Sequence, residues 1–435
     1  MKSLRYAGVL GAGLAGVIAL AAPMPVAAKD TVSLGIVAFL SGPAAGPYGV
    51  PGRNGAEMVI DAINKGTLPA PYGTKGFAGA TVAAEYIDES GGNTKQVSEY
   101  RNLVQKRGVD AIIGYVSSGS CAAVAPVAEE LQTLTVMSVC GTPRIFEEAP
   151  REYVFRTMSH ATADNIAAAH YVKEMMPDVK SYTGINQNYA WGQDSWRDFS
   201  LAMTGLMPDA KVSDKPQFPK IFAGQYGSEI SALSLDDAEL VHSSFWGGDF
   251  EAFILQATPR GFFSQKKVVL TVGGVSAYRL GKRLPDGVAI GSRGPYGILV
   301  RDRDTPLNTW FIKTYRDTYG EYPSGAAYQY AQAILATKIA YDKAAEAAGS
   351  FPNEKQVREA LTGLEFESFA APVKMALGNG HQAVTEHMYG IVQWDEAAGE
   401  LGLRDVKVYP AECVMPPADT TSVEWIEAGM PGAKC

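Results

Sequence analysis

The sequence lacks the short motifs that mark most hydrolases, ATPases and metalloproteins. Its 435 residues include only five histidines, and none of them form an H-E-x-x-H or H-x-x-x-H pair, so a helical zinc site has no support. No G-x-S-x-G elbow marks a serine hydrolase, and no G-x-x-x-x-G-K-[ST] loop marks an ATPase. We therefore expect no enzymatic activity, no catalytic residue, no metal site and no cofactor.

Positive charge is also in deficit. The chain has 38 basic and 46 acidic residues, which gives a formal net charge of −8. A nucleic-acid-binding protein needs a basic face, and anionic lipid attracts basic segments. The charge balance therefore argues against nucleic acid and anionic membrane as partners.

Cysteine is scarce. The four cysteines contain no C-x-x-C pair, so neither zinc nor thioredoxin-type chemistry is indicated. Four cysteines allow three pairings. Proximity in the sequence favours disulfides Cys121–Cys140 and Cys413–Cys435, and free buried thiols are the alternative.

The N-terminus has the layout of a secretory signal peptide. Lys2 and Arg5 precede an apolar run at 7–22, and small residues end at Ala28. The run is short and rich in Ala and Gly, which disfavours a permanent membrane anchor. The G-x-G-x-x-G match at 11–16 follows no strand, so it is not a dinucleotide site. We expect cleavage after Ala28 and export to a compartment that permits disulfides.

Beyond residue 30, short apolar runs alternate with amphipathic stretches. A single core stops growing near roughly 250–300 residues, so this length predicts two domains. Alternating strands and helices predict βαβ units with parallel sheets, an α/β fold of two doubly wound, Rossmann-like lobes. We predict strands at 32–39, 81–87, 110–114, 134–139, 181–186, 211–218, 239–245 and 267–272, and helices at 52–65, 95–107, 122–132, 164–176, 193–206, 227–235 and 249–258.

The last third is mixed. We predict a strand at 287–291, helices at 306–319, 326–348 and 354–361, and strands at 366–369, 388–395 and 403–408. Such material after two α/β units indicates that the chain crosses between the domains more than once.

Polar residues follow several predicted strands. Ligands of open α/β sheets bind beyond the carboxyl ends of the strands, where helix starts offer free N–H groups. The first strand is followed by a loop that includes Tyr48, the third by Ser117 and Ser118, and the fourth by Cys140 and Thr142. These hydroxyls suit a ligand carboxylate, although each one alone would also serve as an ordinary helix cap.

An ordered set of fragments resembles the leucine/isoleucine/valine-binding protein family, the periplasmic solute-binding components of ABC importers. The resemblance implies the type I periplasmic binding protein fold, with a multi-strand hinge between two lobes. The implied lobes are 29–156 with 292–370 and 157–291 with 371–435, after a signal peptide at 1–28. The fragments are 31–39, 41–43, 112–114, 117–118, 154–157, 188–193, 245–248 and 327–332.

The resemblance also implies ligand-binding positions. In the family, the serine after the third strand corresponds to Ser118, beside Ser117, and the carboxylate-binding pair after the fourth corresponds to Cys140 and Thr142. The second-lobe aromatic positions correspond to Trp191 and Trp246, and Tyr48 is a less secure match in the first loop. Ordinary core packing is the alternative for both tryptophans.

One departure from the family concerns the ligand's ammonium group. Amino-acid binders of the family carry a Glu after the strand that corresponds to 267–272, whereas this sequence has Gly273 there. An ammonium buried without a counter-charge costs several kcal/mol, so a free α-amino acid is disfavoured unless Asp249 or Asp194 supplies the charge. The tryptophans favour a small carboxylate with an apolar or aromatic body.

The resulting hypothesis is a monomeric periplasmic protein that closes two lobes around a small solute and delivers it to an ABC permease in the inner membrane. The alternatives are amino-acid binding by the same fold, a ligand-sensing module for a membrane signalling partner, and, remotely, an exported serine hydrolase. We expect Arg156 to secure the crossover between the lobes and Arg53 to be a solvated surface group.

Overall fold

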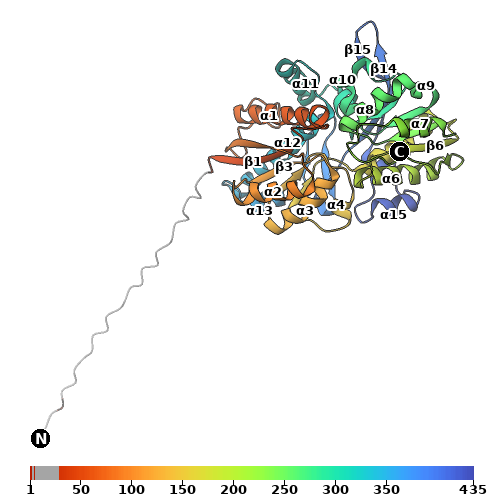
Figure 1. Ribbon diagram of the computed structural model, residues 1–435. Helices are drawn as coiled ribbons and strands as arrows, with labels where there is room; N and C mark the ends of the chain where they lie inside the picture. Colours follow the sequence, from red (N-terminus) through yellow and green to blue (C-terminus); the bar gives the residue numbers. More distant parts are fainter. Residues whose placement is uncertain (2–3, 5–28) are drawn as a thin grey trace.

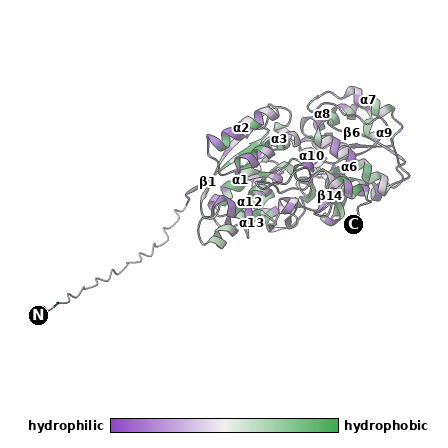
Figure 2. Ribbon diagram, turned by 90° about the horizontal axis from the view of Figure 1, so that it is seen from below, coloured by the Kyte–Doolittle hydropathy of each residue, from purple (hydrophilic) through white to green (hydrophobic). Residues whose placement is uncertain are grey.

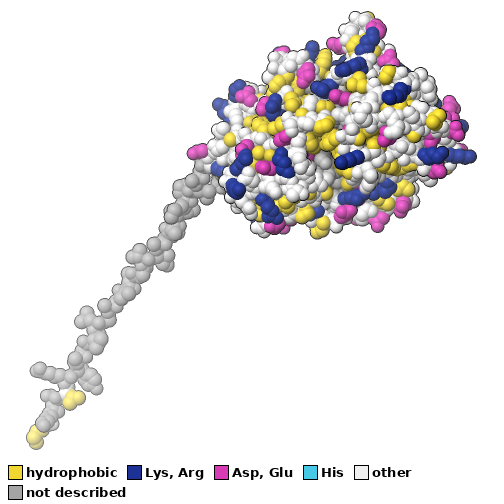
Figure 3. Space-filling view, in the orientation of Figure 1, with side chains coloured by type: hydrophobic (Ala, Val, Ile, Leu, Met, Phe, Trp, Pro, Cys, Tyr) yellow, Lys and Arg dark blue, Asp and Glu magenta, His cyan; other side chains and the backbone are white. Residues whose placement is uncertain are grey.

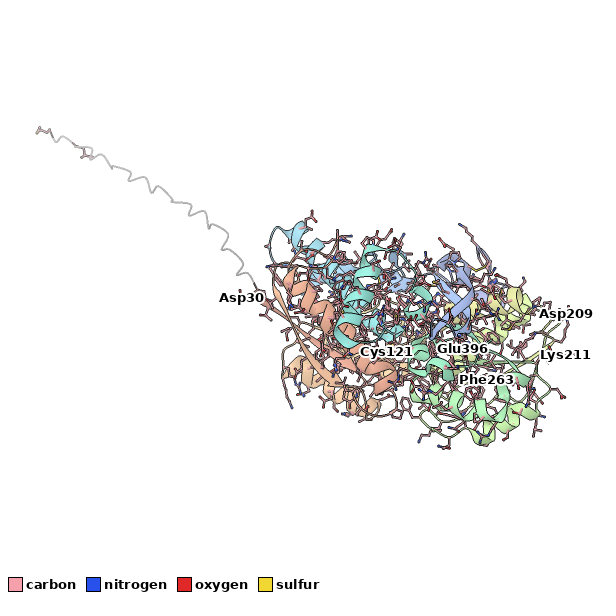
Figure 4. All side chains as sticks on the ribbon, turned by 90° about the horizontal axis from the view of Figure 1, so that it is seen from above. Asp30, Cys121, Asp209, Lys211, Phe263 and Glu396 are labelled. Atoms are coloured by element: carbon pink, nitrogen blue, oxygen red, sulfur yellow. A yellow bond between two sulfur atoms is a disulfide. The ribbon has the colours of Figure 1, made fainter. Side chains whose placement is uncertain are left out.

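The computed structural model describes residues 1, 4 and 29–435, so most of the predicted signal peptide lies outside the described residues. Two lobes lie side by side, each built on a twisted sheet with helices on its faces (Figure 1). Seen from above, Asp30 marks the start of the first lobe, and Asp209 and Lys211 lie at the opposite end of the molecule (Figure 4). The α/β fold class predicted from the sequence is confirmed.

The first lobe contains an eight-stranded sheet in the order β11-β12-β13-β5-β4-β3-β1-β2. The strands β1 to β5 are parallel, as short βαβ units require. All four residues of β3 are buried, which explains its continuous apolar sequence. The strands are β1 (Thr31–Ala38), β2 (Thr81–Asp88), β3 (Ala111–Gly114), β4 (Thr135–Met137), β5 (Val154–Arg156), β11 (Glu365–Phe366), β12 (Val373–Leu377) and β13 (Gln382–Val384).

Helices cover both faces of this sheet. The long helix α12 is buried around most of its circumference and packs against α1, which is why its sequence is rich in Ala and Tyr. The helices of the first lobe are α1 (Val50–Lys65), α2 (Asn93–Gln105), α3 (Ser118–Leu131), α4 (Arg144–Glu147), α11 (Pro306–Tyr319), α12 (Gly325–Ala348) and α13 (Glu354–Leu361).

The second lobe contains a seven-stranded sheet in the order β15-β14-β10-β9-β8-β6-β7. Its central strands are parallel, and the β14–β15 hairpin adds an antiparallel edge. The strands are β6 (Ser181–Ile185), β7 (Lys211–Val212), β8 (Leu240–Ser243), β9 (Lys267–Leu270), β10 (Ala289–Gly291), β14 (His387–Asp395) and β15 (Glu400–Tyr409).

In the described part of the chain, eight α-helices accompany this sheet. They are α5 (Ala161–Met175), α6 (Ala190–Leu206), α7 (Gly227–Leu235), α8 (Gly247–Ala257), α9 (Phe262–Gln265), α10 (Gly273–Leu280), α14 (Ala411–Val414) and α15 (Ser422–Glu427). Those labelled in Figure 2, such as α6, α7 and α8, carry hydrophilic and hydrophobic residues side by side, as helices that cover one face of a sheet do.

Three details differ from the sequence-based expectation. The strands β12 and β13 pair in the first sheet, beyond the lobe boundary expected at residue 370. The strand predicted at 211–218 is regular only at Lys211–Val212, where both residues are exposed and pairing is confined to one neighbour. A helix, α10, begins at Gly273, where we expected only a strand end.

Both predicted disulfides are present. Cys121–Cys140 joins α3 to the loop after β4, and Cys413–Cys435 ties the last residue to α14. Cys121 lies well inside the molecule (Figure 4). All four cysteines are paired in these two bridges.

The surface carries both signs of charge. On the face shown in Figure 3, basic and acidic side chains are interspersed over both lobes. Among the described residues, no helix combines the length and the hydropathy that a membrane span requires.

Candidate ligand-binding site

A small cavity lies between the lobes, at the carboxyl ends of the strands. Four side chains proposed from the sequence line it together: Tyr48 and Ser118 from the first lobe, and Trp191 and Trp246 from the second. Its volume is about 10 Å³, which is room for roughly one water molecule. The lobes are therefore closed upon each other. The other lining residues are Val116, Val139, Tyr189, Val272 and Arg293.

One wall of the cavity is aromatic. The Trp246 indole N–H donates to the Tyr189 hydroxyl at 2.7 Å, which fixes the orientation of the ring. The ring centroids of Tyr48 and Trp246 are 5.6 Å apart in an edge-to-face arrangement, and Phe39 and Phe222 pack on the same indole. Because Tyr48 and Phe39 belong to the first lobe, this cluster joins the lobes.

Trp191 forms the opposite aromatic surface. Its N–H donates to the Ser244 carbonyl at 2.8 Å, and the Arg293 guanidinium carbon lies 4.5 Å from the ring centroid. A Cβ at Gly141 would lie only 2.3 Å from this ring and 2.5 Å from Arg293 Nη2. Glycine therefore permits the first-lobe backbone to approach the ring and the guanidinium.

Arg293 is the residue that the sequence analysis missed. It is 4% exposed, and its Nε and Nη2 have no hydrogen-bond partner among the described residues. Its nearest carboxylate is Asp164, 3.5 Å from Nε. Its backbone φ of 56° lies in the left-handed region, which costs a non-glycine residue about 1–3 kcal/mol and is concentrated at functional sites.

A sequence signal for Arg293 did exist. It follows the strand predicted at 287–291 by two residues, so it lies beyond the carboxyl end of β10. The strand-end position that identified Ser118 therefore applies equally to Arg293.

Thr142 does not line the cavity, contrary to the carboxylate-binding role expected for it. Its hydroxyl donates to Asp194 Oδ2 at 2.7 Å, which connects the loop after β4 to α6 of the second lobe. Arg144 and Arg197 also contact this buried carboxylate. Thr142 therefore serves contact between the lobes.

The backbone amides after β4 already have partners. Ser118 Oγ accepts from the N–H groups of Gly141 and Thr142, both at 3.2 Å. The Cys140 N–H donates to the Tyr115 carbonyl, and the Cys140 sulfur is in the disulfide. Cys140 thus lies outside the cavity, with its sulfur and its N–H both engaged.

Ser117 also lies outside the cavity, and Glu89 engages the backbone amides at the start of α3. The Glu89 carboxylate accepts from the Val116 N–H at 2.7 Å and the Ser117 N–H at 2.9 Å. Burial raises the Glu89 pKa to about 7, although these hydrogen bonds oppose the rise. The helix start that we expected to bind a ligand carboxylate holds the protein's own carboxyl group.

Gly273 is buried at the first turn of α10, and its neighbour Val272, not Gly273, lines the cavity. A Cβ at Gly273 would lie 2.7 Å from the Ile290 side chain, so the glycine permits close packing of α10 on β10.

No carboxylate is among the residues described as lining the cavity. Asp194 is engaged by Thr142 and two arginines, and Asp249 accepts from Gln187 and from the Phe222 N–H, both at 2.7 Å. Asp249 Oδ1 has no hydrogen-bond partner among the described residues, but neither acid lines the cavity where an ammonium group would lie.

The two other arginines from the sequence analysis lie outside the cavity. Arg156 donates to the Cys140 and Thr142 carbonyls at 2.9 and 2.7 Å and to Gln382, so it holds the crossover strand β5 to its surroundings. Arg53 is partly exposed and pairs with Glu57 on α1.

At neutral pH the tyrosine hydroxyls that line the cavity carry no charge, and Arg293 is the cation among the described lining residues. Burial raises the pKa of Tyr48 to about 12, while the nearby Arg293 opposes the rise. Burial also raises the pKa of Tyr189. A ligand would meet neutral hydroxyl groups, indole faces and one guanidinium.

A family model described as periplasmic binding protein matches residues 31–400. A search of curated protein sequences finds no match.

Several solved structures share the fold. A solute-binding protein of an ABC transporter from Rhodopseudomonas palustris, in complex with 3,4-dihydroxybenzoic acid, is 18% identical, with 90% of this chain and 100% of that chain covered and a TM-score of 0.74. Another solute-binding protein from R. palustris, in complex with benzoate, is 19% identical. The match covers 86% of this chain and 96% of that chain, with a TM-score of 0.72. A leucine-binding protein from Thermotoga maritima is 19% identical. The match covers 86% of this chain and 98% of that chain, with a TM-score of 0.70.

Proposed function

The chain belongs to the periplasmic binding protein family, and from that membership we propose that it binds a small carboxylate with a flat apolar or aromatic body for an ABC importer. The carboxylate pairs with Arg293, and the body lies between the indoles of Trp191 and Trp246. Tyr48 and Ser118 contribute hydroxyl groups from the first lobe.

The observation that carries this proposal is the Arg293 guanidinium. A buried charge with unpartnered nitrogens is costly, and a bound anionic ligand would offset this cost by accepting hydrogen bonds from them. A guanidinium presents a planar pair of donors that matches a carboxylate. The structural neighbours bound to benzoate and dihydroxybenzoate support the same ligand class.

A free amino acid is the less favoured ligand. Its ammonium group needs an acceptor or a counter-charge, and no described residue lining the cavity carries a carboxylate. At 19% sequence identity, the similarity to the leucine-binding protein concerns the fold and does not extend to the ligand.

Binding requires the lobes to separate. A volume of about 10 Å³ is far below the roughly 300 Å³ or more of a typical ligand pocket. The solute enters an open form, and contacts to both lobes then favour closure around it.

Three solutes of similar size test the proposal in a thermal unfolding assay. Benzoate at 100 times its dissociation constant adds about 2.7 kcal/mol to the free energy of unfolding, which raises the melting temperature. Benzamide has the same shape without the charge and is expected to give little shift. Stabilisation by L-leucine without stabilisation by benzoate would overturn the proposal.

The cellular role completes the proposal: a monomer, exported with cleavage after Ala28, that presents its closed form to an inner-membrane permease. Loss of benzoate uptake on deletion of the adjacent permease genes separates this role from that of a signalling sensor. Mass spectrometry after incubation is expected to recover the solute unchanged, and a hydrolysed product would indicate an enzyme.

A further inference from the structure

A second pocket lies near the crossover between the lobes, apart from the cavity that holds Arg293. Its volume is about 340 Å³. Three chain segments wall it: 143–150 around α4, 377–382 between β12 and β13, and 416–421 of the C-terminal tail. Figure 1 shows α4 and α15 next to each other on this side of the molecule.

Two buried polar side chains line this pocket with unpartnered atoms. Arg156 is fully buried, and its Nη2 has no hydrogen-bond partner in the described part of the chain, although its other nitrogens hold the crossover. His160 is 2% exposed, and its Nδ1 is unpartnered in the same sense. The hydrogen bonds that Arg156 makes at the crossover do not involve its Nη2, so both this atom and His160 Nδ1 are available to a ligand.

An acid faces the same pocket. Glu147 lines it, and its Oε1 accepts from the N–H of Ser422 at 3.0 Å and from the Ser422 hydroxyl. Burial raises the pKa of Glu147, while the hydrogen bonds from Ser422 and the nearby Arg156 charge oppose the rise. Arg156 and Glu147 both line the pocket without forming an ion pair among the described residues, and the Arg156 guanidinium carbon lies 5.4 Å from the centroid of the Phe146 ring between them in the lining.

The remaining lining residues of the pocket add negative charge and apolar surface. Glu148 and Asp419 are exposed lining residues, and they add negative charge. The walls between the charges are apolar, formed by Pro143, Phe146, Leu377, Pro416 and Pro417. A simple anion placed here would meet one cation and three acids, which disfavours it.

We propose that this pocket binds a small zwitterion of the α-amino acid class, with its carboxylate on Arg156 Nη2 and its ammonium group toward Glu147. Such a ligand satisfies both charges. It connects the crossover strand to the C-terminal tail. The site is distinct from the solute cavity, where no acid is available for an ammonium group.

Alanine and two analogues that each lack one of its charged groups test the charge requirement. L-Alanine carries both charges, propionate lacks the ammonium group, and ethylammonium lacks the carboxylate. By titration calorimetry or NMR, L-alanine is expected to bind at least about ten-fold more tightly than either of the others. Equal binding of propionate would overturn the zwitterion assignment, and so would the absence of L-alanine binding.

Hydrogen exchange locates the probe. L-Alanine is expected to slow exchange of backbone amides at 377–382 and 416–422 and to leave the amides around Trp246 unchanged. Protection confined to the solute cavity would overturn the proposal. This result is independent of whether benzoate binds, so failure here is distinguishable from failure of the proposed function.

A conservative variant tests the acid. Glu147→Gln keeps an oxygen that accepts from Ser422 and removes the negative charge, so L-alanine binding is expected to weaken about ten-fold while propionate binding does not weaken. Glu359→Gln, at an exposed position on α13, is the matched control and is expected to bind as the unmodified protein does. Unchanged binding by Glu147→Gln would overturn the assignment, and should that variant unfold, the exchange data on the unmodified protein still decide.

Discussion

The two walls of the solute cavity differ in how their polar groups are engaged. On the first lobe, Ser118 accepts from two backbone amides and Glu89 from two more, so the helix start there has its partners within the protein. Beyond β10 of the second sheet, on the crossover back to the first lobe, Arg293 keeps two nitrogens without a hydrogen-bond partner among the described residues, and its guanidinium lies over the indole of Trp191. In the function we propose, Arg293 and the second-lobe indoles select the solute, and the first lobe mainly closes over it.

The largest effect is expected from Arg293→Gln. Removing one partner of a desolvated charge pair costs about 2–5 kcal/mol, so benzoate binding should weaken by about a thousand-fold in calorimetry. Because Asp164 also loses a cation, the melting temperature has to be measured in parallel. Arg53→Gln, a partly exposed arginine, is the control; equal losses in both variants would contradict the role of Arg293.

The variant Glu89→Gln tests whether the buried carboxyl group of the first lobe makes stability depend on pH. The raised pKa means that between about 4.5 and 7 the native protein holds a proton that the unfolded chain has released. Stability therefore falls as pH rises through this window, by about 3 kcal/mol. Urea unfolding across the window should show this fall relative to the variant, and parallel curves would show that Glu89 titrates normally.

Trp246→Ala is expected to weaken benzoate binding by about 2 kcal/mol, roughly thirty-fold, since central indoles dominate such contacts. The protein should remain folded, as circular dichroism can verify. Trp310→Ala on α11, away from the cavity, provides the comparison. An unchanged benzoate affinity would remove Trp246 from the site.

The smallest effect is expected from Thr142→Val. This variant loses the hydrogen bond to Asp194 between the lobes, worth about 1 kcal/mol, and no contact to the solute. Affinity should fall about five-fold and equally for every solute tested. A loss seen for benzoate alone would instead return Thr142 to the ligand-binding set.

The regular elements were predictable where periodicity and end signals agree. The helices at 227–235, 306–319 and 354–361 have the predicted bounds; the second begins with Pro306 after the cap Thr305, and the third with the capping box of Asn353 and Gln356. The segments β12 and β13 were not found because they are only five and three residues long and meet at a glycine-containing turn.

Individual side-chain roles were less predictable than the place of the site. Strand-end reasoning and family resemblance together identified Tyr48, Ser118, Trp191 and Trp246, which do line one cavity. They also placed Thr142 there, because residue type does not reveal which partner a hydroxyl selects. That choice depends on Asp194, 52 residues away in the sequence.

The chain passes between the sheets three times, after β5, after β10 and after β13. We expect three crossings to favour hinge-like rotation of the lobes over sliding or twisting. Opening then has a single coordinate, which a pair of fluorescent labels at Asp30 and Asp209 would follow. Every bound solute should give the same end point on that coordinate, and solutes should differ only in how much of the protein has reached it.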